Sequence, residues 1–263
     1  MENFTDSLTA EKITDGLETK FIGQNIIYRD VTESTNTLAK QNYSLPDGTL
    51  FIAESQTAGK GRLGRSWTSE KGVGIWMSIL LKPSISPEEV SKITLGAGLA
   101  VCYALGNGAM IKYPNDIVIG TKKVCGILTE MSAEADKVNY VVCGIGINVN
   151  TEKFDGELTQ KATSLFEVTG KEYGRCDIVK KVLCEFEKLY CEFIENGLNN
   201  IIEDYKKHCI NIGADVHVIF QNNEITGKCV DITKDGAVVI ESDGKNIEIS
   251  SGEVSIRGIY GYV

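Results

Sequence analysis

Three glycines and three cations share one nine-residue stretch, from Gly59 to Trp67, which reads GKGRLGRSW. Glycine lets a backbone close around a ligand without a side-chain clash. Arginine carries a permanently charged fork that suits phosphate and carboxylate oxygens. The stretch therefore predicts a loop that binds an anionic ligand and becomes ordered when that ligand arrives.

Two other interpretations of this loop are open. The spacing from Gly59 to Gly64 is that of a P-loop, but Arg65 stands where a P-loop has lysine. A P-loop also runs directly into a helix, whereas here a polar stretch and then a strand follow. The stretch also fits a solvated, basic surface turn.

A second group of charged residues begins at 112–117 (KYPNDI) and returns along 122–130 (KKVCGILTE). We expect strands at 111–119 and 124–131, joined as a hairpin by a turn at 120–122. Such a hairpin brings its lysines to one end of a sheet. Taken alone, the pattern favours an ordinary hairpin with exposed lysines.

The rest of the chain predicts strands and helices that could position these groups. Strands are expected at 26–28, 50–53, 74–81 and 140–149, helices at 32–40, 86–105, 177–196 and 201–210, a short helical segment within 1–20, and irregular structure at 151–175. From Gly213 onward, short alternating segments with turns at 235–236 and 243–244 predict a small β-barrel. We therefore expect one domain at 1–211 and a second at 212–263.

Composition narrows the class of protein. The 263 residues carry a net charge of −9, which argues against nonspecific nucleic-acid binding. No apolar run reaches membrane-spanning length, and the N-terminus lacks the features of a signal peptide. The eight cysteines form no Cys-x-x-Cys pair, so we expect reduced thiols in a cytoplasmic protein. His208 and His217 have no ligand-like spacing, and no metal site is fixed by the sequence.

Together, these motifs closely resemble those of biotin protein ligases (biotin–acetyl-CoA-carboxylase ligases). The resemblance rests on the glycine–arginine loop at 59–67, the Lys-Trp-Pro-Asn-Asp motif at 112–116, Lys-x-x-Gly-Ile-Leu-x-Glu at 123–130, Gly-Ile-Gly-Ile-Asn-Val at 144–149, Ala-Thr-Ser-Leu at 162–165, and a tail at 252–257 similar to the family's C-terminal barrel. It covers about residues 25–263. Tyr113 replaces the usual tryptophan, a change that keeps an aromatic face and that we expect to be tolerated.

The resemblance implies an α+β fold. Its catalytic domain would be class II aminoacyl-tRNA synthetase-like, a mixed β-sheet with helices, and an SH3-like β-barrel would follow. It also implies a two-step reaction, in which biotin attacks the α-phosphate of ATP to give biotinyl-5′-adenylate and pyrophosphate. A lysine of a biotin carboxyl carrier protein, such as the acetyl-CoA carboxylase subunit, then displaces AMP. Mg²⁺ would accompany ATP.

The resemblance also implies roles for individual residues. Lys123 and Arg62 would be catalytic, because positive charge must offset the repulsion between two reacting anions. Biotin would contact Ser34, Thr35, Asn36, Gln56, Lys60, Gly61, Arg62, Lys123 and Trp67. ATP and the adenylate would contact Gly59, Gly64, Arg65, Lys112, Asn115, Asp116 and Asn148.

Some of these residues also have ordinary structural interpretations. Ser34 could cap a helix, Trp76 could be core packing beside the ligand wall, and Asn148 could only cap the end of a strand. The loop would exclude water from the adenylate. At Lys60, where arginine is commoner in the family, backbone contact to the ureido group would make the side-chain change mild.

Two other functions remain. A lipoate or octanoate ligase or transferase of the same fold would not need the ureido partners Ser34, Thr35 and Gln56. A non-catalytic biotin-sensing repressor would need a helix-turn-helix domain, which we do not expect because the catalytic region begins near residue 25. We accordingly expect no nucleic-acid or membrane partner, and a homodimer through sheet edges is left open.

Overall fold

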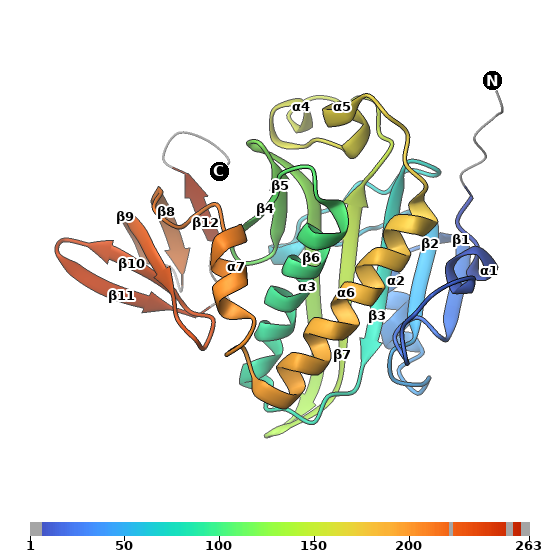
Figure 1. The fold of residues 1–263 in the computed structure, drawn as a ribbon, viewed down its shortest axis with the longest axis horizontal. Helices are drawn as coiled ribbons and strands as arrows, with labels where there is room; N and C mark the ends of the chain where they lie inside the picture. Colours follow the sequence, from blue (N-terminus) through green and yellow to red (C-terminus); the bar gives the residue numbers. More distant parts are fainter. Residues whose placement is uncertain (1–6, 221–222, 251–254, 259–263) are drawn as a thin grey trace.

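The computed structural model describes residues 7–220, 223–250 and 255–258 (Figure 1). Its larger part is a seven-stranded mixed sheet in the order β1-β2-β3-β7-β6-β5-β4. These strands are β1 (Ile26–Thr32), β2 (Leu50–Gln56), β3 (Gly74–Leu81), β4 (Ala109–Lys112), β5 (Asp116–Ile119), β6 (Lys122–Glu134) and β7 (Lys137–Asn148). Only the β1–β2 pairing is parallel among the pairings of this sheet within the described residues.

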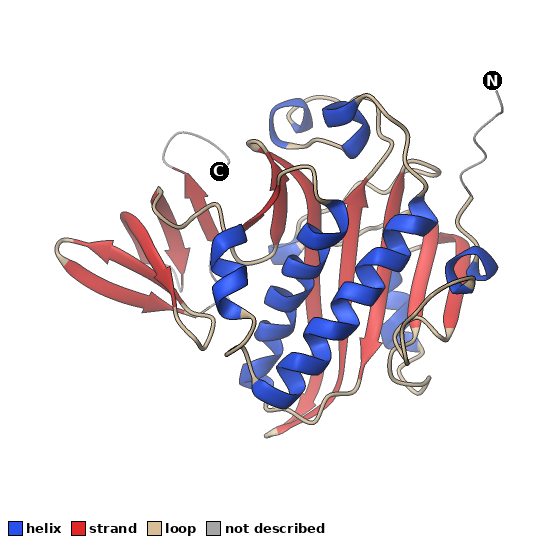
Figure 2. Cartoon of the chain, in the orientation of Figure 1, coloured by secondary structure: helices blue, strands red, loops and turns tan. Residues whose placement is uncertain are grey.

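The two faces of this sheet are covered differently. On β3, Ile75, Met77, Ile79 and Leu81 face the main core, whereas Leu80 joins a small second core on the opposite face. The long helices α3 (Val90–Leu105) and α6 (Arg175–Asn196) lie side by side over the main-core face (Figure 2). The opposite face carries the short helix α2 (Thr35–Gln41) and, over Gly126 and Gly146, the indole of Trp67.

Most expected elements are confirmed. The predicted helix at 86–105 is present as a 3₁₀ turn, η2 (Pro87–Glu89), followed by α3, with Ser86 and Glu89 forming a capping box. The short helices α1 (Ala10–Thr14) and α7 (Ile202–His208) lie within the expected helical segments, and the 3₁₀ turn η1 (Arg62–Gly64) lies inside the glycine–cation loop. No helix in the described parts of the chain is long and apolar enough to cross a membrane.

Two expectations were wrong. The single strand expected at 111–119 is two strands, β4 and β5, separated by a turn with a cis Tyr113–Pro114 bond. Proline has no N–H for a strand ladder, so the motif bends back instead of continuing. The region 151–175 contains two short helices, α4 (Leu158–Lys161) and α5 (Leu165–Thr169). Ser164 caps α5, and such short helices leave no long periodic pattern in the sequence.

The C-terminal region forms a separate five-stranded antiparallel sheet in the order β11-β10-β9-β8-β12. Its strands are β8 (Asp215–Phe220), β9 (Asn223–Ile232), β10 (Val238–Ser242), β11 (Lys245–Ile249) and β12 (Ser255–Gly258). The turns expected at 235–236 and 243–244 join consecutive strands of this sheet. Part of the tail motif, 252–254, lies outside the described residues.

Candidate functional site

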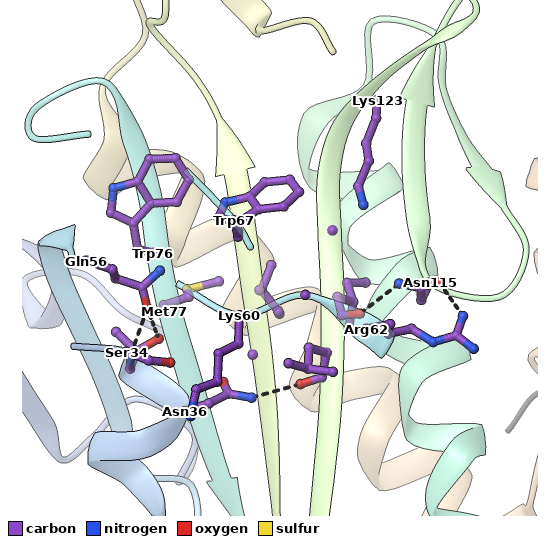
Figure 3. A pocket seen from close by; sticks show the side chains of 18 residues that line it. Ser34, Asn36, Gln56, Lys60, Arg62, Trp67, Trp76, Met77, Asn115 and Lys123 are labelled. Carbon is purple, nitrogen blue, oxygen red and sulfur yellow. Dashed lines mark hydrogen bonds between the residues drawn. The ribbon is translucent and has the colours of Figure 1, made fainter. Parts of the chain in front are cut away.

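A cavity occupies the sheet face opposite α3 and α6, beneath the glycine–cation loop (Figure 3). It is lined by Ser34, Thr35, Asn36, Gln56, Lys60, Gly61, Arg62, Trp67, Trp76, Met77, Asn115, Lys123, Gly126, Ile127, Leu128, Gly144, Ile145 and Gly146. Six of these residues also line a larger cleft of ≈ 1310 Å³: Gly61, Arg62, Trp67, Trp76, Asn115 and Lys123. The cavity and the cleft are therefore two compartments of one site, with Lys123 and Arg62 at their junction.

One end of the cavity is a preorganised polar group around Gln56. Its Oε1 accepts a hydrogen bond from the Thr35 backbone N–H at 2.8 Å, and its Nε2 donates to Ser69 Oγ at 2.7 Å. Ser34 is buried at the start of α2, but its side chain makes no capping hydrogen bond. Ser34 is thus the N-cap residue of α2, as its helix-cap interpretation predicted, but its hydroxyl makes no capping bond and lines the cavity with donor and acceptor capacity.

Asn36 lines the same cavity but has its polar atoms occupied by protein. Its Nδ2 donates to Leu128 O at 3.2 Å and to Glu130 Oε2 at 2.8 Å, and its Oδ1 lies 2.5 Å from Ser78 Oγ. These contacts brace α2 against β3 and β6. Asn36 thus shapes the polar end of the cavity through its bonds to protein. The Ser34 side chain, by contrast, makes no capping bond.

Two tryptophans build the apolar wall. Trp67 and Trp76 meet edge to face, with ring centroids 6.5 Å apart, and Trp76 Nε1 donates to Glu70 O at 3.1 Å. The indole of Trp67 lies over the backbone of two glycines. A Cβ at Gly126 or Gly146 would come within 2.9 or 2.7 Å of that ring, so only glycine fits there. Within the described structure, the buried Nε1 of Trp67 has no hydrogen-bond partner.

Lys123 is held over this wall by two contacts. Its Nζ lies 2.6 Å from Asp116 Oδ1 and 4.9 Å from the centroid of the Trp67 ring. The side chain remains 22 % exposed, toward the junction of cavity and cleft. An anion bound at that junction would meet a cation that is already oriented, which reduces the reorganisation needed during reaction.

Arg62 ties the loop to the turn between β4 and β5. Its Nη1 donates to Asn115 Oδ1 at 2.7 Å, and Asn115 Nδ2 donates to Asp116 Oδ1 and to Ile127 O. Burial lowers the pKa of Arg62, but arginine remains charged at any physiological pH. The two motifs of the sequence therefore meet through one guanidinium.

The loop itself is a tight, backbone-bonded structure. Gly61 N–H donates to Arg65 O at 2.7 Å and Trp67 N–H to Gly59 O at 2.9 Å. Leu63 and Gly64 have φ values of 56° and 72°, in the left-handed region. Gly59 and Gly64 line neither compartment of the site. Position 59 requires glycine for packing, because a Cβ there would lie 2.4 Å from Trp67 O.

Lys60 stands apart from the other loop cations. Its Nζ donates to Thr37 Oγ1 at 3.0 Å on the surface of α2, while the residue still lines the cavity. The side chain therefore latches the loop to α2, and the part of Lys60 left for a ligand is its backbone.

The larger cleft is lined by cations and by residues from distant segments. Arg65, Lys112, Asp116 and Asn148 line it together with Phe154, Leu158 and the C-terminal residues Ser255, Ile256 and Arg257. Burial, reinforced by nearby Lys123, Arg257 and Arg65, lowers the pKa of Lys112 to about 8, although Asp116 opposes the shift. Asn148 ends β7 and donates through Nδ2 to Thr163 O at 3.1 Å, so it secures that strand end as well as lining the cleft.

Several residues of the site escaped the sequence analysis. Gly144 admits Asn36, since a Cβ there would lie 2.1 Å from Asn36 Oδ1. Glycine at 144 and 146, two residues apart in an apolar strand, was the available signal for close approach on one face. Ser78, which bonds Thr35 and Asn36, gave no such signal. The described residues contain no cluster of three or more His, Cys, Asp or Glu that could hold a metal ion.

Comparison with known proteins identifies the fold. The chain matches the Biotin/lipoate A/B protein ligase family over residues 28–148 and the Biotin protein ligase C terminal domain over residues 212–257. A structure of biotin protein ligase from Aquifex aeolicus in complex with biotin and ATP has a TM-score of 0.80 to this chain. It is 33 % identical, and the match covers 89 % of this chain and 99 % of that one.

Curated relatives lead to the same group. The bifunctional ligase/repressor BirA of Bacillus spizizenii is 38 % identical over 257 residues, covering 95 % of this chain and 79 % of that protein. The biotin–[acetyl-CoA-carboxylase] ligase of Mycobacterium tuberculosis is 29 % identical over 217 residues, which is 79 % of each. On this evidence of sequence and fold, the chain belongs to the biotin protein ligase family.

Proposed function

We propose that this enzyme activates biotin as biotinyl-5′-adenylate and transfers the biotinyl group to a lysine of a carrier protein. The observation that carries the proposal is the position of Lys123. Its ammonium lies where a cavity with polar and aromatic walls opens into a cation-lined cleft. A carboxylate from one side and an α-phosphate from the other would meet at this cation.

The small cavity suits biotin. A ureido ring needs fixed donors and acceptors, because a buried polar group left unpaired is costly. Ser34, Thr35 and Gln56 supply such partners at one end, and Trp67 and Trp76 supply an apolar wall. In this proposal the biotin carboxylate points to Lys123.

The cleft suits ATP. Arg65 and Lys112 would neutralise its phosphates, with Asn148 near the nucleoside. In the first step a biotin carboxylate oxygen forms a bond to the α-phosphorus, and the bond to pyrophosphate breaks. In the second step the acceptor amine attacks the biotinyl carbonyl, loses a proton and displaces AMP.

Mg²⁺ would enter with ATP. Asp116 offers one carboxylate, already bonded to Lys123, and Asn115 offers one amide oxygen, already accepting from Arg62. This donor set fits a magnesium ion held mainly by substrate phosphates and water, as Mg²⁺ commonly is. Its chemistry would be to screen the phosphate charge while Lys123 and Arg62 orient the reacting oxygens.

The acceptor, compartment and division of the chain belong to the same proposal. The relatives named for acetyl-CoA carboxylase suggest its biotin carboxyl carrier protein as the acceptor. Eight free cysteines, six of them buried, suit the reducing cytoplasm. A boundary between residues 211 and 212 is supported by the C-terminal family match, which begins at 212.

The test is ATP–pyrophosphate exchange by the purified protein with Mg²⁺, run with biotin, lipoate or octanoate. Exchange that depends on biotin alone is expected. Exchange with lipoate or octanoate would move the enzyme to the sister activities, which the catalytic family description also includes. Failure with every acid would contradict the proposal.

A further inference from the structure

The most deeply buried charged residue in the described part of the chain, Arg175, lies outside the ligand site. Arg175, the first residue of α6, has no exposed surface, and Glu54 in β2 is 5 % exposed. Nη1 of Arg175 donates to Glu54 Oε2 at 2.8 Å, and Nη2 donates to Oε1 at 3.2 Å. Burying two charges costs free energy unless geometry and further hydrogen bonds compensate, so the other partners of this pair matter.

Those partners lie at both ends of one connection. Glu54 stands two residues before Gln56, near the end of β2, and Gly74 is the first residue of β3. Arg175 Nη1 also donates to Gly74 O at 3.1 Å. One guanidinium therefore contacts both roots of the segment 57–73, which contains the glycine–cation loop.

The strand ladder stops where this contact begins. The β2–β3 register runs from the Leu50–Ile79 pair to the Ala53–Trp76 pair. Beyond Ala53, Arg175 bridges the two strands by bonding Glu54 of β2 and Gly74 O of β3. The end of β2 then pairs with the segment itself, through the Gln56–Ser69 bridge. The N-terminal segment also contacts this pair, since Leu8 N–H donates to Glu54 Oε1 at 3.0 Å.

We propose that Glu54 and Arg175 are positioning residues that clamp the two roots of the loop segment 57–73. Neither side chain lines the cavity or the cleft, so each acts through the loop. The clamp sets the separation of the two strand ends from which the segment starts and to which it returns. Gln56 is the last residue of the first strand, and Trp67 lies within the segment. The inference deepens the proposed function, because it concerns the loop that would close over the adenylate.

The loop carries its own probe of opening. Trypsin cuts after Lys60, Arg62 and Arg65. Lys60 and Arg65 are exposed and Arg62 is half-buried, but the backbone must unfold locally to enter the protease, so the cleavage rate reports opening of the segment. Native-state cleavage at these residues, followed by mass spectrometry of the fragments, needs neither ligand nor turnover. In Glu54→Gln, which keeps the shape and loses the charge, we expect loop cleavage about tenfold faster than in the parent, the scale of a weakened charged hydrogen bond.

Glu187→Gln is the matched control. Glu187 is also a buried glutamate, 7 % exposed, and accepts hydrogen bonds from the backbone N–H groups of Lys20, Phe21 and Ile22. We expect Glu187→Gln to accelerate cleavage after the exposed Lys20 and to leave the loop sites unchanged. Glu54→Gln should show the reverse pattern.

Other outcomes would overturn the inference. Equal acceleration at the loop and at Lys20 in Glu54→Gln would mean general destabilisation, and unchanged loop cleavage would mean that the pair does not hold the roots. Should Glu54→Gln fail to fold, Arg175→Lys keeps the charge without the fork that reaches Gly74, and the same site-selective pattern is required of it. Absence of biotin-dependent exchange in the parent, with selective loop cleavage in the variant, would remove the proposed function and keep the clamp.

Discussion

The Glu54–Arg175 pair and the Asp116–Lys123 pair have similar N–O distances, 2.8 and 2.6 Å, but opposite surroundings. The first is sealed, with side-chain exposures of 6 and 0 %, and the carboxylate also accepts a hydrogen bond from the backbone N–H of Leu8. The second is open to the cleft, with exposures of 16 and 22 %. Water and ligand can therefore compete for Lys123 but not for Arg175.

This difference explains how the ends of the loop can stay fixed while a cation of the site remains free to bind an incoming anion. A sealed pair that loses one partner leaves an uncompensated buried charge, so it stays formed and serves as an anchor. An open pair is screened and exchangeable, so Lys123 can transfer from Asp116 to an incoming anion at small cost. Removing the open cation should thus affect chemistry, whereas changes on sealed contacts should affect stability or loop opening.

The largest effect is expected from Lys123→Ala. Adenylate formation should fall by roughly 10²–10³, because a preorganised charge at the reacting oxygens is lost, while biotin still binds. Pyrophosphate exchange measures adenylate formation, and calorimetric titration measures biotin binding. Lys122→Ala is the control, since Lys122 pairs with Glu167 at 3.1 Å outside the cavity and the cleft. Unchanged exchange in Lys123→Ala would show that this residue takes no part in the mechanism. It would also contradict the proposed difference between the open and the sealed ion pair.

Arg62→Gly should have the next largest effect. Losing the bond to Asn115 should let the adenylate escape about tenfold faster and label lysines of bystander proteins. Labelling of an added non-acceptor protein measures the escape. Leu63→Gly is the matched control, because Leu63 is 69 % exposed at φ 56° and glycine there adds freedom without removing the Asn115 contact. If both variants leak alike, loop flexibility and not the Arg62 contact retains the adenylate.

A smaller effect should appear with pH. Lys112 has its pKa lowered from 10.5 to about 8, so its charge and its attraction for ATP are lost as pH rises through 8. The unfolded chain binds more protons between pH 8 and 10.5, so the contribution of Lys112 to the free energy of unfolding rises over that window. KM for ATP should increase between pH 7 and 9.5, and Lys112→Arg should flatten the profile. A flat profile in the parent would contradict the assignment.

The smallest effect is expected from Tyr113→Phe. The Tyr113 hydroxyl donates to Gly236 O at 2.9 Å, a buried contact between the β4–β5 turn and the C-terminal sheet. Its loss leaves an acceptor unpaired and should lower the free energy of unfolding by about 1 kcal/mol, read from urea unfolding. Tyr103→Phe, which removes an exposed bond to Asp204, should change it less. Equal decreases in the free energy of unfolding for the two variants would show that burial does not strengthen the Tyr113 hydrogen bond.

The sequence by itself determined the elements whose patterns are local. Helical periodicity, capping residues and alternating apolar strands predicted α3, α6 and the C-terminal sheet, because those signals lie within one segment. The matched motifs likewise indicated the family. The turn with cis Tyr113–Pro114 and the short helices α4 and α5 went unpredicted, since their conformations depend on neighbours far along the chain.

Only the tertiary structure decided how the charges are paired. Glu54 and Arg175 are 121 residues apart, and no local pattern marks either as the partner of the other. The same holds for the tyrosine that replaces tryptophan at 113, whose hydroxyl reaches a carbonyl 123 residues away. Residue types and spacing set which chemistry was available. Burial and long-range contact then determined that Lys123 stays open to a ligand while Arg175 is sealed.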